Sequence, residues 1–451
     1  MRKSHVLTAG LCLLALSLGS ASSAVAQPLM GLYYNEVEKD GRVYVFNTPE
    51  TFKAWGEGGE MGKSVTLVGR AEGGKTLVAE NETAVDLYLF KHNLPGYDRP
   101  TPKPYTPGFS VSWKDGVTSI ESKSSLLNLN NRMQIRFTHE DLDPANGTQP
   151  ERDSFRVRRM ETKLSGWVYT KDLAYELELN WADTANVVND ANFQWDLTRG
   201  KKAFMVKAGQ FKVPFGRQEL SSSTGQEFVD RSIVAAEFER GRDIGVQLWG
   251  TPLGGKLDWR VGVFNGNGRT TTRNDNDDMQ TNARLTWQPF GDVKYSEGDF
   301  ESTDNLLFAV AAQYENNTLP IALAGTTPAH AREREILGAD LVLKFHGLFV
   351  LGEYFDASND RTAGLSSFDN TGLNLQAGYF IVPKTFEVAV RFSEVDPNKD
   401  RDNDKRTETG LALGYFFNKH PHKIQADYRE IKNDANSQKD KEMRLQYQIL
   451  F

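Results

Sequence analysis

The sequence predicts an all-β fold: a sixteen-stranded antiparallel transmembrane β-barrel, preceded by a small α+β periplasmic unit. Three observations lead to this prediction. Segments of about ten residues with strict period-2 alternation follow one another between residues 109 and 451. The connections between these segments alternate between short and long, and the first residues have the features of an export signal. After the first 25 residues, no apolar run is long enough for a transmembrane helix.

Residues 1–26 are expected to be a secretory signal peptide. A basic start and the apolar stretch Val6–Leu18 precede Ala24-Val25-Ala26, which has the small-residue pattern of a cleavage site. The one cysteine of the sequence, Cys12, lies inside this segment. The mature chain would therefore carry no thiol for a disulfide or for a thiolate metal site.

The composition excludes several classes of protein. Aromatic residues make up 11% of the chain, and β-branched residues are plentiful, which argues against disorder. The mean hydropathy of −0.52 does not fit a helical membrane protein. The formal net charge is −7, so a nucleic acid is not an expected partner.

Residues 27–93 are expected to form the small α+β unit, and the proline-rich residues 94–108 are expected to form a stiff, extended linker. The elements predicted for the unit are a strand over 42–46, a helix opening at Pro49, a hairpin over 65–79 with a Gly73-Gly74 turn, and a helix over 83–92.

Residues 109–451 are expected to form the barrel. In the last segment, Met443, Leu445 and Tyr447 alternate with Arg444 and Gln446, which gives one apolar and one polar face. A soluble β-sandwich also alternates, with its apolar face inside, whereas a transmembrane barrel turns its apolar face to lipid. The export signal, the Trp and Tyr residues at the ends of apolar faces, and the alternating connection lengths favour the barrel.

The predicted strands and loops follow in a regular order. The sixteen strands cover roughly 125–138, 154–170, 172–181, 191–197, 203–211, 243–250, 257–264, 281–288, 305–314, 335–345, 348–355, 371–381, 385–393, 407–417, 422–431 and 442–451. Long polar loops are expected at 139–153, 212–242, 265–280, 315–334, 356–370 and 394–406. The connection 289–304 is an exception, because it is long where a short turn is expected. An even number of strands places both ends of the barrel on the periplasmic side.

The chain ends on an aromatic residue, Phe451, on the apolar face of the last strand. A terminal aromatic on an amphipathic strand resembles the insertion signal of bacterial outer-membrane barrels. The alternative is a chance hydrophobic terminus. We expect Phe451 to be read by the barrel-assembly machinery.

The sequence resembles the phosphate-selective porin O and P family over about residues 110–451, and the stretch 209–249 is the most specific part. The resemblance is carried by Ser154-Phe155-Arg156-Val157-Arg158-Arg159, Leu164–Tyr169, Gly209–Leu220, Phe228-Val229-Asp230-Arg231, Gly241–Leu248, Phe264–Gly268 and Met443–Tyr447. The family implies a trimeric outer-membrane porin of sixteen strands whose third external loop, here 212–242, folds inward and narrows the pore. Residues 27–108 lie outside the resemblance.

Two adjacent arginines are the first candidates for the pore lining. Val157 and Leu164 both look lipid-facing although their positions have opposite parity, which predicts a β-bulge between them. Such a bulge would let both Arg158 and Arg159 reach the lumen.

The resemblance implies an anion path, and guanidinium groups suit oxyanions because they donate two parallel hydrogen bonds. The alternative is that each cation is paired with a carboxylate and simply fills the barrel. The expected members of this path are Arg132, Arg158, Arg159, Lys207 and Arg231.

The constriction loop gives less support for phosphate selectivity. Its five basic residues are Lys212, Arg217, Arg231, Arg240 and Arg242, and its five acidic residues are Glu219, Glu227, Asp230, Glu237 and Glu239. Glu219 stands where the resemblance implies a lysine in phosphate-selective members, and a carboxylate there would repel phosphate. At the inward positions of the strands, basic residues only slightly outnumber acidic ones, so we expect a mild anion preference.

No metal or cofactor is expected. Asp400, Asp402 and Asp404 resemble half of a calcium loop but lack its glycine and its final glutamate. His420 and His422 are expected to share one strand face, but the sequence shows no third ligand beside them.

The sequence thus predicts an outer-membrane porin that passes small hydrophilic solutes by passive diffusion and that is not an enzyme. The expected partners are outer-membrane lipid, small anions including phosphate-like oxyanions, the barrel-assembly machinery, and further copies of the chain in a homotrimer. Two alternatives stay open. A barrel enzyme would need a histidine beside a serine or carboxylate at one height on adjacent strands. A structural or adhesive barrel would have a plugged lumen.

Overall fold

The structure is a computed structural model, and it describes residues 33–58, 60–99, 108–143, 151–269, 274, 276–301, 304–320, 331–361 and 365–451. The chain divides into two compact units, with the boundary between residues 105 and 106. The predicted signal peptide with Cys12 and the central part of the predicted linker lie outside the described residues. Among the helices of the described ranges, we find none with the length and apolar character needed to span a membrane.

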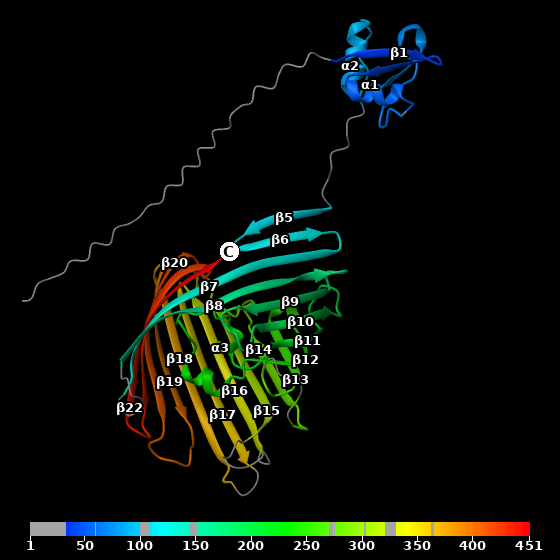
Figure 1. Cartoon of the computed structure of the whole chain (residues 1–451). Helices are drawn as coiled ribbons and strands as arrows, with labels where there is room; N and C mark the ends of the chain where they lie inside the picture. The colour runs from blue at the N-terminus through cyan, green and yellow to red at the C-terminus, as the bar shows by residue number, and fades with distance from the viewer. Residues whose placement is uncertain are drawn as a thin grey trace, which may run out of the picture. The chain divides into compact units, whose positions relative to one another are not determined.

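The first unit, blue in Figure 1, is a four-stranded sheet with two α-helices, ordered β1-β2-β4-β3. Its elements are β1 Asn35–Lys39, β2 Arg42–Phe46, α1 Pro49–Gly56, β3 Val65–Leu67, the 3₁₀ turn η1 Glu72–Gly74, β4 Thr76–Ala79 and α2 Glu82–Lys91. Strand β2 runs parallel to β4, and the other two pairs are antiparallel. Val45, Leu77 and Val85 are fully buried and form the core with their neighbours. The predicted helices and hairpin are present, while the polar strand β1 is not evident from the sequence.

The second unit contains a closed antiparallel ring of sixteen strands, β7 to β22 (Figure 1). The strands are β7 Ser125–Asp141, β8 Glu151–Val168, β9 Leu173–Asn180, β10 Val188–Asp196, β11 Met205–Lys212, β12 Arg242–Gly250, β13 Leu257–Phe264, β14 Gln280–Trp287, β15 Leu307–Pro320, β16 Ala331–Phe345, β17 Leu348–Arg361, β18 Phe368–Val382, β19 Phe386–Asp396, β20 Arg406–Asn418, β21 His422–Asn433 and β22 Gln438–Leu450. The ring closes where β22 pairs with β7, from Leu450 opposite Arg132 to Lys441 opposite Asp141.

Every predicted barrel strand corresponds to one strand of the ring. The largest differences lie at the ends of β15, β16 and β17, which extend beyond the predicted bounds by several polar residues. The hydrophobic alternation stops where lipid ends, but backbone pairing continues into the polar region, so the pattern underestimates strand length there.

A hairpin of two further strands, β5 Phe109–Lys114 and β6 Val117–Ser122, precedes the ring and is not predicted from the sequence. Strand β6 pairs with the start of β7, from Thr118 opposite Leu129 to Glu121 opposite Leu126. Strands β6 and β22 therefore pair with the same edge of β7, β6 over Leu126–Leu129 and β22 from Arg132 onward. The hairpin turns at Gly116, whose φ is +82° and where a Cβ atom would lie 2.9 Å from the carbonyl carbon of Leu450.

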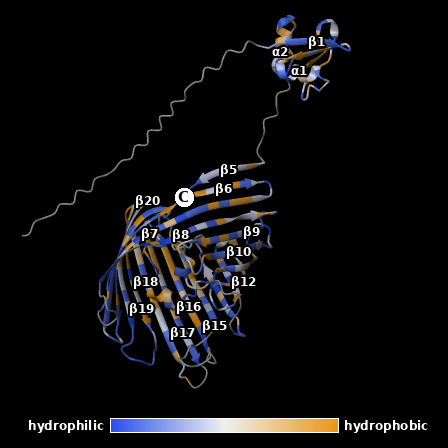
Figure 2. Ribbon diagram, in the orientation of Figure 1, coloured by the Kyte–Doolittle hydropathy of each residue, from blue (hydrophilic) through white to orange (hydrophobic). Residues whose placement is uncertain are grey.

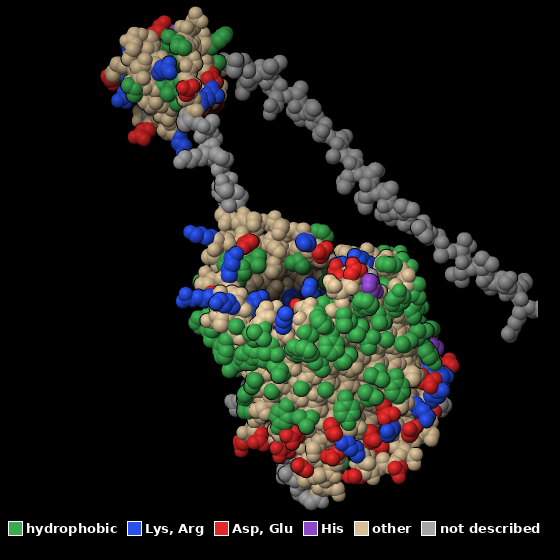
Figure 3. All heavy atoms as spheres, turned by 180° about the vertical axis from the view of Figure 1, so that it is seen from behind, with side chains coloured by type: hydrophobic (Ala, Val, Ile, Leu, Met, Phe, Trp, Pro, Cys, Tyr) green, Lys and Arg blue, Asp and Glu red, His purple; other side chains and the backbone are tan. Residues whose placement is uncertain are grey.

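The barrel has an apolar outside and a polar inside, the reverse of a soluble sandwich. On β22 the outward side chains Met443, Leu445 and Tyr447 are 37–53% exposed, whereas the inward Arg444 and Gln446 are at most 2% exposed. Figure 2 shows this alternation along the strands, and Figure 3 shows hydrophobic side chains gathered over the barrel wall between charged rims. This surface is what a lipid-embedded barrel requires, because lipid offers no partner to charged or amide groups.

Two segments fold into the barrel. The loop between β11 and β12, residues 213–241, contains two short helices, α3 Arg217–Leu220 and α4 Ile233–Phe238, and is called the constriction loop below. The second segment connects β14 to β15 at the opposite end of the barrel and is described over residues 288–301 and 304–306. A separate 3₁₀ turn, η3 Leu253–Gly255, lies between β12 and β13. The Glu297 N–H of the second segment donates to the carbonyl oxygen of Gly225 at 2.7 Å, so the two segments meet inside the lumen. This contact explains why the connection is long where a short turn is expected.

Candidate functional site

The constriction loop lies against one wall of the barrel because that wall accepts hydrogen bonds from its backbone. Four inward side chains of β15, β17, β20 and β21 are the acceptors: Gln313 from Gly216 (2.8 Å), Glu353 from Arg217 and Gln218 (2.8 and 3.0 Å), Glu408 from Ile233 (2.8 Å) and Asp427 from Val229 (3.0 Å). Buried backbone N–H groups need such partners when water is excluded. These inward polar residues therefore hold the loop and do not line an open path.

Aromatic packing reinforces this placement. The Phe238 ring of α4 stacks on Phe355 of β17, with ring centroids 5.3 Å apart and an interplanar angle of 9°. The wall has glycines where the loop presses closest. A Cβ atom at Gly372 would lie 2.5 Å from Phe238, and one at Gly410 would lie 2.8 Å from Phe228. The wall is thus shaped to seat the loop.

A cavity of about 700 Å³ remains between the constriction loop and the opposite wall, formed by β7 to β13. Among the residues that the structure describes, eleven basic side chains line it: Arg132, Arg158, Arg159, Lys163, Lys207, Lys212, Arg231, Arg240, Arg242, Arg260 and Arg269. Six acidic side chains also line it: Glu161, Glu176, Glu178, Asp183, Asp190 and Glu219. The lining therefore carries a net positive charge of five, although the whole chain is acidic.

The predicted β-bulge is confirmed by the register between β7 and β8. Gln134 lies opposite Arg159 and Ile135 lies opposite Val157, which leaves Arg158 as the extra residue. The bulge changes the direction of successive side chains, and both Arg158 and Arg159 line the cavity.

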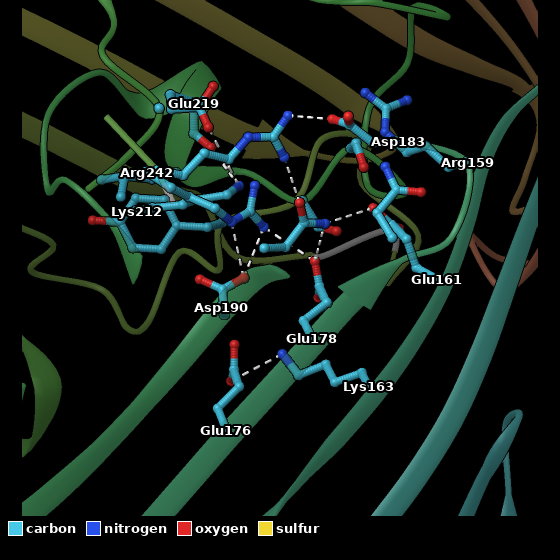
Figure 4. A pocket seen from close by; sticks show the side chains of 18 of the residues that line it. Arg159, Glu161, Lys163, Glu176, Glu178, Asp183, Asp190, Lys212, Glu219 and Arg242 are labelled. Carbon is cyan, nitrogen blue, oxygen red and sulfur yellow. Dashed lines mark hydrogen bonds and ion pairs between the residues drawn. The ribbon is translucent and has the colours of Figure 1, made fainter. Parts of the chain in front are cut away.

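Most cations of the lining are closely paired (Figure 4). The pairs join neighbouring strands and the loop: Arg132 with Glu161 and Glu178, Arg242 with Asp190 (2.8 Å) and Glu178 (3.1 Å), Lys163 with Glu176 (3.0 Å), and Arg231 with Glu219 (3.2 Å). Ion pairs of this kind fill and stiffen the wall. For these residues the geometry agrees with the alternative in which each cation is paired with a carboxylate and fills the barrel.

Among the described residues, five cations of the lining have no carboxylate within hydrogen-bond distance, and two of these, Lys212 and Arg240, donate to backbone carbonyl oxygens instead. The other three are Arg158, Arg159 and Lys207. Arg158 and Arg159 each face Asp230, at 3.6 and 3.9 Å between nitrogen and oxygen, which is beyond hydrogen-bond distance. Lys207 has its ammonium 4.4 Å from the centroid of the Phe211 ring and forms no salt bridge within the part of the chain that the structure describes. These three groups have donors available to a solute.

The other predicted site residues are placed in different surroundings. Arg217 points away from the cavity and donates to the carbonyl oxygens of Val293 (2.7 Å) and Lys294 (3.0 Å), so it links the two inward segments. Arg240 lines the cavity, and its guanidinium donates to the carbonyl oxygen of Gly266 at 2.8 Å. Phe451 is half exposed, and its backbone exchanges two hydrogen bonds with Asn131.

The prediction that His420 and His422 share a strand face is wrong. His420 lies in the turn before β21 and is turned inward, with Nε2 3.0 Å from the carbonyl oxygen of Glu297. His422 begins the strand on its outer face, 2.9 Å from the Tyr447 hydroxyl and stacked on Phe417. The two residues lie in different surroundings because His420 belongs to the turn before β21 and His422 to the strand itself.

One group of acids has the spacing of metal ligands. Glu176, Glu178 and Asp190 of β9 and β10 present oxygens within 4.8 Å of one another. Each of the three is bound to Lys163, Arg132 or Arg242. The group therefore belongs to the ion-pair network of the wall.

One feature of the site is not evident from the sequence: Asp230 of the constriction loop faces wall arginines as well as Arg158 and Arg159. The wall residues are Arg136 of β7 and Arg444 of β22. Their inward direction follows from the alternation of their strands. The position of the loop does not, because no local pattern shows which wall a long loop will contact.

Comparisons with known proteins agree with this architecture. A sequence model of the family described as phosphate-selective porin O and P matches residues 127–449. An uncharacterized protein of Aquifex aeolicus (strain VF5) is 21% identical over 380 residues, which cover 74% of this chain and 88% of that protein.

Two solved structures share the fold. An anion-selective porin from Comamonas acidovorans has a TM-score of 0.53 at 12% identity, over 72% of this chain and 100% of the porin. The outer membrane channel DcaP of Acinetobacter baumannii has a TM-score of 0.52 at 14% identity, over 73% and 99%. At these identities the likeness concerns the fold alone.

Proposed function

The chain belongs to the phosphate-selective porin O and P family, and on this premise we propose that its lumen passes small hydrophilic solutes with a mild preference for anions. The protein is a porin of the bacterial outer membrane. Transport through such a pore is passive, because a charged, wet lumen lowers the cost of crossing the lipid without any chemical step.

The observation that carries the proposed anion preference is the excess of positive charge in the cavity, together with the loose pairing of Arg158, Arg159 and Lys207. A cation that is already hydrogen-bonded to a carboxylate offers little to a passing anion. A guanidinium with free N–H groups can bind an oxyanion through two parallel bonds. These three residues are the proposed anion path, and Arg132 and Arg231 contribute to its field.

Phosphate-like oxyanions fit this path only weakly. Glu219 lies in the lining where a lysine would attract phosphate, although Arg231 at 3.2 Å and Lys212 at 4.0 Å offset its charge. Charge at a narrow position dominates selectivity. We therefore propose general anion preference rather than phosphate specificity.

Reversal potential in planar bilayers under a salt gradient tests this proposal. We expect wild-type channels to favour anions, and the double substitution Arg158→Glu with Arg159→Glu to move the preference toward cations. The matched control is Lys201→Glu with Lys202→Glu, an equal change of charge in the exposed turn between β10 and β11, outside the cavity. Equal reversal potentials for wild type and the arginine variant would rule out Arg158 and Arg159 as part of the path.

The geometry gives less support to the other two functions. A plugged barrel would have its lumen filled beside the inward segments, but a cavity of about 700 Å³ persists there. For an enzyme, His139 Nδ1 does lie 2.7 Å from Asp153 on the adjacent strand, but both side chains are exposed at the outer end of the strands. No histidine is among the described residues that line the cavity. The family and the fold favour a channel.

We also propose that the porin is a homotrimer. A structurally similar chain, OmpT of Vibrio cholerae, is described in a trimer form, with a TM-score of 0.51 at 10% identity. Chemical cross-linking of the detergent-extracted protein tests this assembly. A single monomer band at all cross-linker concentrations would contradict it.

A further inference from the structure

Asp230 is held in a fixed position within the lumen. The N–H of the preceding Val229 donates to Asp427 at 3.0 Å, and the Val229 carbonyl oxygen accepts from Arg136 at 3.0 Å. The carbonyl oxygen of Asp230 itself accepts from Arg391 at 3.0 Å. These contacts come from three different strands, so the carboxylate is placed by the wall as well as by the loop.

Four arginines surround the Asp230 carboxylate. On the wall side, Oδ2 accepts a hydrogen bond from Arg136 and lies 3.8 Å from Arg444 Nη1. On the cavity side, Oδ1 lies 3.6 Å from Arg158 Nη2 and 3.9 Å from Arg159 Nη2. The Asp230 side chain is 25% exposed, and it lies behind the lining residues Arg158 and Arg159.

The two sides differ in how far their donors are satisfied. Arg136 also binds the Gln446 side chain, and Arg444 binds Asp427 through two hydrogen bonds of 2.8 Å. Arg159 has one further contact, from Nη1 to Gln134, and Arg158 has no other salt bridge among the described residues. Asp230 therefore attracts the two cavity arginines through charge without accepting a hydrogen bond from either of them.

From this geometry we propose that Asp230 is a built-in counter-ion that sets the strength of the anion preference by competing with passing anions for Arg158 and Arg159. The inference rests on the proposed anion path and adds a residue that determines its selectivity. An anion that binds these guanidiniums is repelled by the carboxylate about 4 Å behind them. Conduction needs binding that is strong enough for entry and weak enough for release. Asp230 weakens the binding of anions to Arg158 and Arg159.

The test is the substitution Asp230→Asn, which keeps the size of the side chain and one acceptor oxygen for Arg136. We expect the ratio of anion to cation permeability, from reversal potentials, to rise about threefold, because an anion bound beyond the guanidiniums lies about 6–7 Å from the carboxylate in water. We also expect inorganic phosphate to block the chloride current at lower concentration. The control is Asp183→Asn, which removes a lining carboxylate paired with Arg269 and should give a smaller shift.

A second pair of variants separates this role from a structural one. In the background Arg158→Gln with Arg159→Gln, the Asp230→Asn shift should largely disappear, because the competition no longer exists. Uptake of a neutral sugar by proteoliposomes should be unchanged by Asp230→Asn, whereas a displaced loop would alter it.

The outcomes distinguish the counter-ion role of Asp230 from the proposed anion path. If the arginine variant shifts the reversal potential but Asp230→Asn does not, the counter-ion role is wrong and the anion path stands. An undiminished Asp230→Asn shift in the arginine background would also overturn the inference. If neither the arginine variant nor Asp230→Asn shifts the potential, the anion path fails and the inference fails with it.

Discussion

Glu353 is the acceptor on which the docking of α3 depends, and replacing it with alanine should widen the pore. One oxygen, Oε1, accepts the backbone N–H groups of Arg217 and Gln218 at 2.8 and 3.0 Å. All three residues are buried, so water does not reach these donors in the docked state. The substitution Glu353→Ala removes the acceptor and leaves both N–H groups without a partner.

The size of the effect follows from these two hydrogen bonds. A buried donor left unpaired costs about 1–3 kcal/mol, so two of them cost about 2–6 kcal/mol. Because about 1.4 kcal/mol is tenfold in an equilibrium constant, the docked segment would be disfavoured about thirtyfold at the lower end. The aromatic contact of Phe238 and the acceptors Glu408 and Asp427 are untouched. The loop should therefore detach only around α3.

Single-channel conductance and sugar uptake by proteoliposomes measure this change. We expect a larger conductance and faster uptake of large sugars for Glu353→Ala, with the barrel still folded in detergent. Glu353→Gln is the matched control, since its Oε1 can accept both N–H groups and should preserve the wild-type cut-off. A wild-type conductance and a wild-type sugar cut-off for Glu353→Ala would refute the reasoning.

Two further predictions concern the small first unit and the C-terminal residue Phe451. The hydrogen bond of His92 to Glu36 raises the pKa of His92, and burial opposes this with a smaller effect. The stability that this ion pair contributes is therefore present below about pH 6.5 and is lost as the pH rises through the raised pKa. Burial opposes ionisation of Glu36, but hydrogen bonds from Tyr34, His92 and Lys91 outweigh it and lower its pKa to about 2, so its contribution is lost as the pH falls toward 2. Calorimetry of the full chain should therefore show that His92→Gln lowers the melting temperature of the small unit at pH 6 and much less at pH 9; an equal loss at both values would contradict the ion pair. Deleting Phe451 should lower the amount of barrel in outer-membrane fractions, while Phe451→Tyr should not, and normal assembly after the deletion would disprove an insertion signal.

The barrel can be predicted from the sequence because its main pattern is local. Lipid outside and water inside force a period of two along each strand, and that period can be read without knowing any long-range contact. The same pattern predicts a bulge between Val157 and Leu164, where the parity of the apolar positions slips, and the register places it at Arg158. The β5–β6 hairpin is less evident, because its strands are short and its residues are largely exposed.

The interior of the lumen could not be predicted in the same way. The sequence pattern places the acids Glu353, Glu408 and Asp427 on the inner face of the barrel. If all inward charges lined one pore, these acids would disfavour the passage of anions. They instead bind backbone N–H groups of the constriction loop. Which acids have this role depends on contacts between residues more than a hundred positions apart, and no local pattern encodes them.

The fold therefore divides the lumen into two walls with different functions, and this division makes an acidic chain compatible with an anion path. Along β15 to β21, buried carboxylates hold the loop and are removed from the solute path. Along β7 to β13, the described lining of the cavity has a net positive charge of five and includes the loosely paired Arg158, Arg159 and Lys207. A buried, hydrogen-bonded carboxylate on the far wall acts on a solute only through a longer distance, whereas Arg158 and Arg159 lie at the cavity surface. Substitutions along β7 to β13 should accordingly change the selectivity, and substitutions along β15 to β21 should change the pore size.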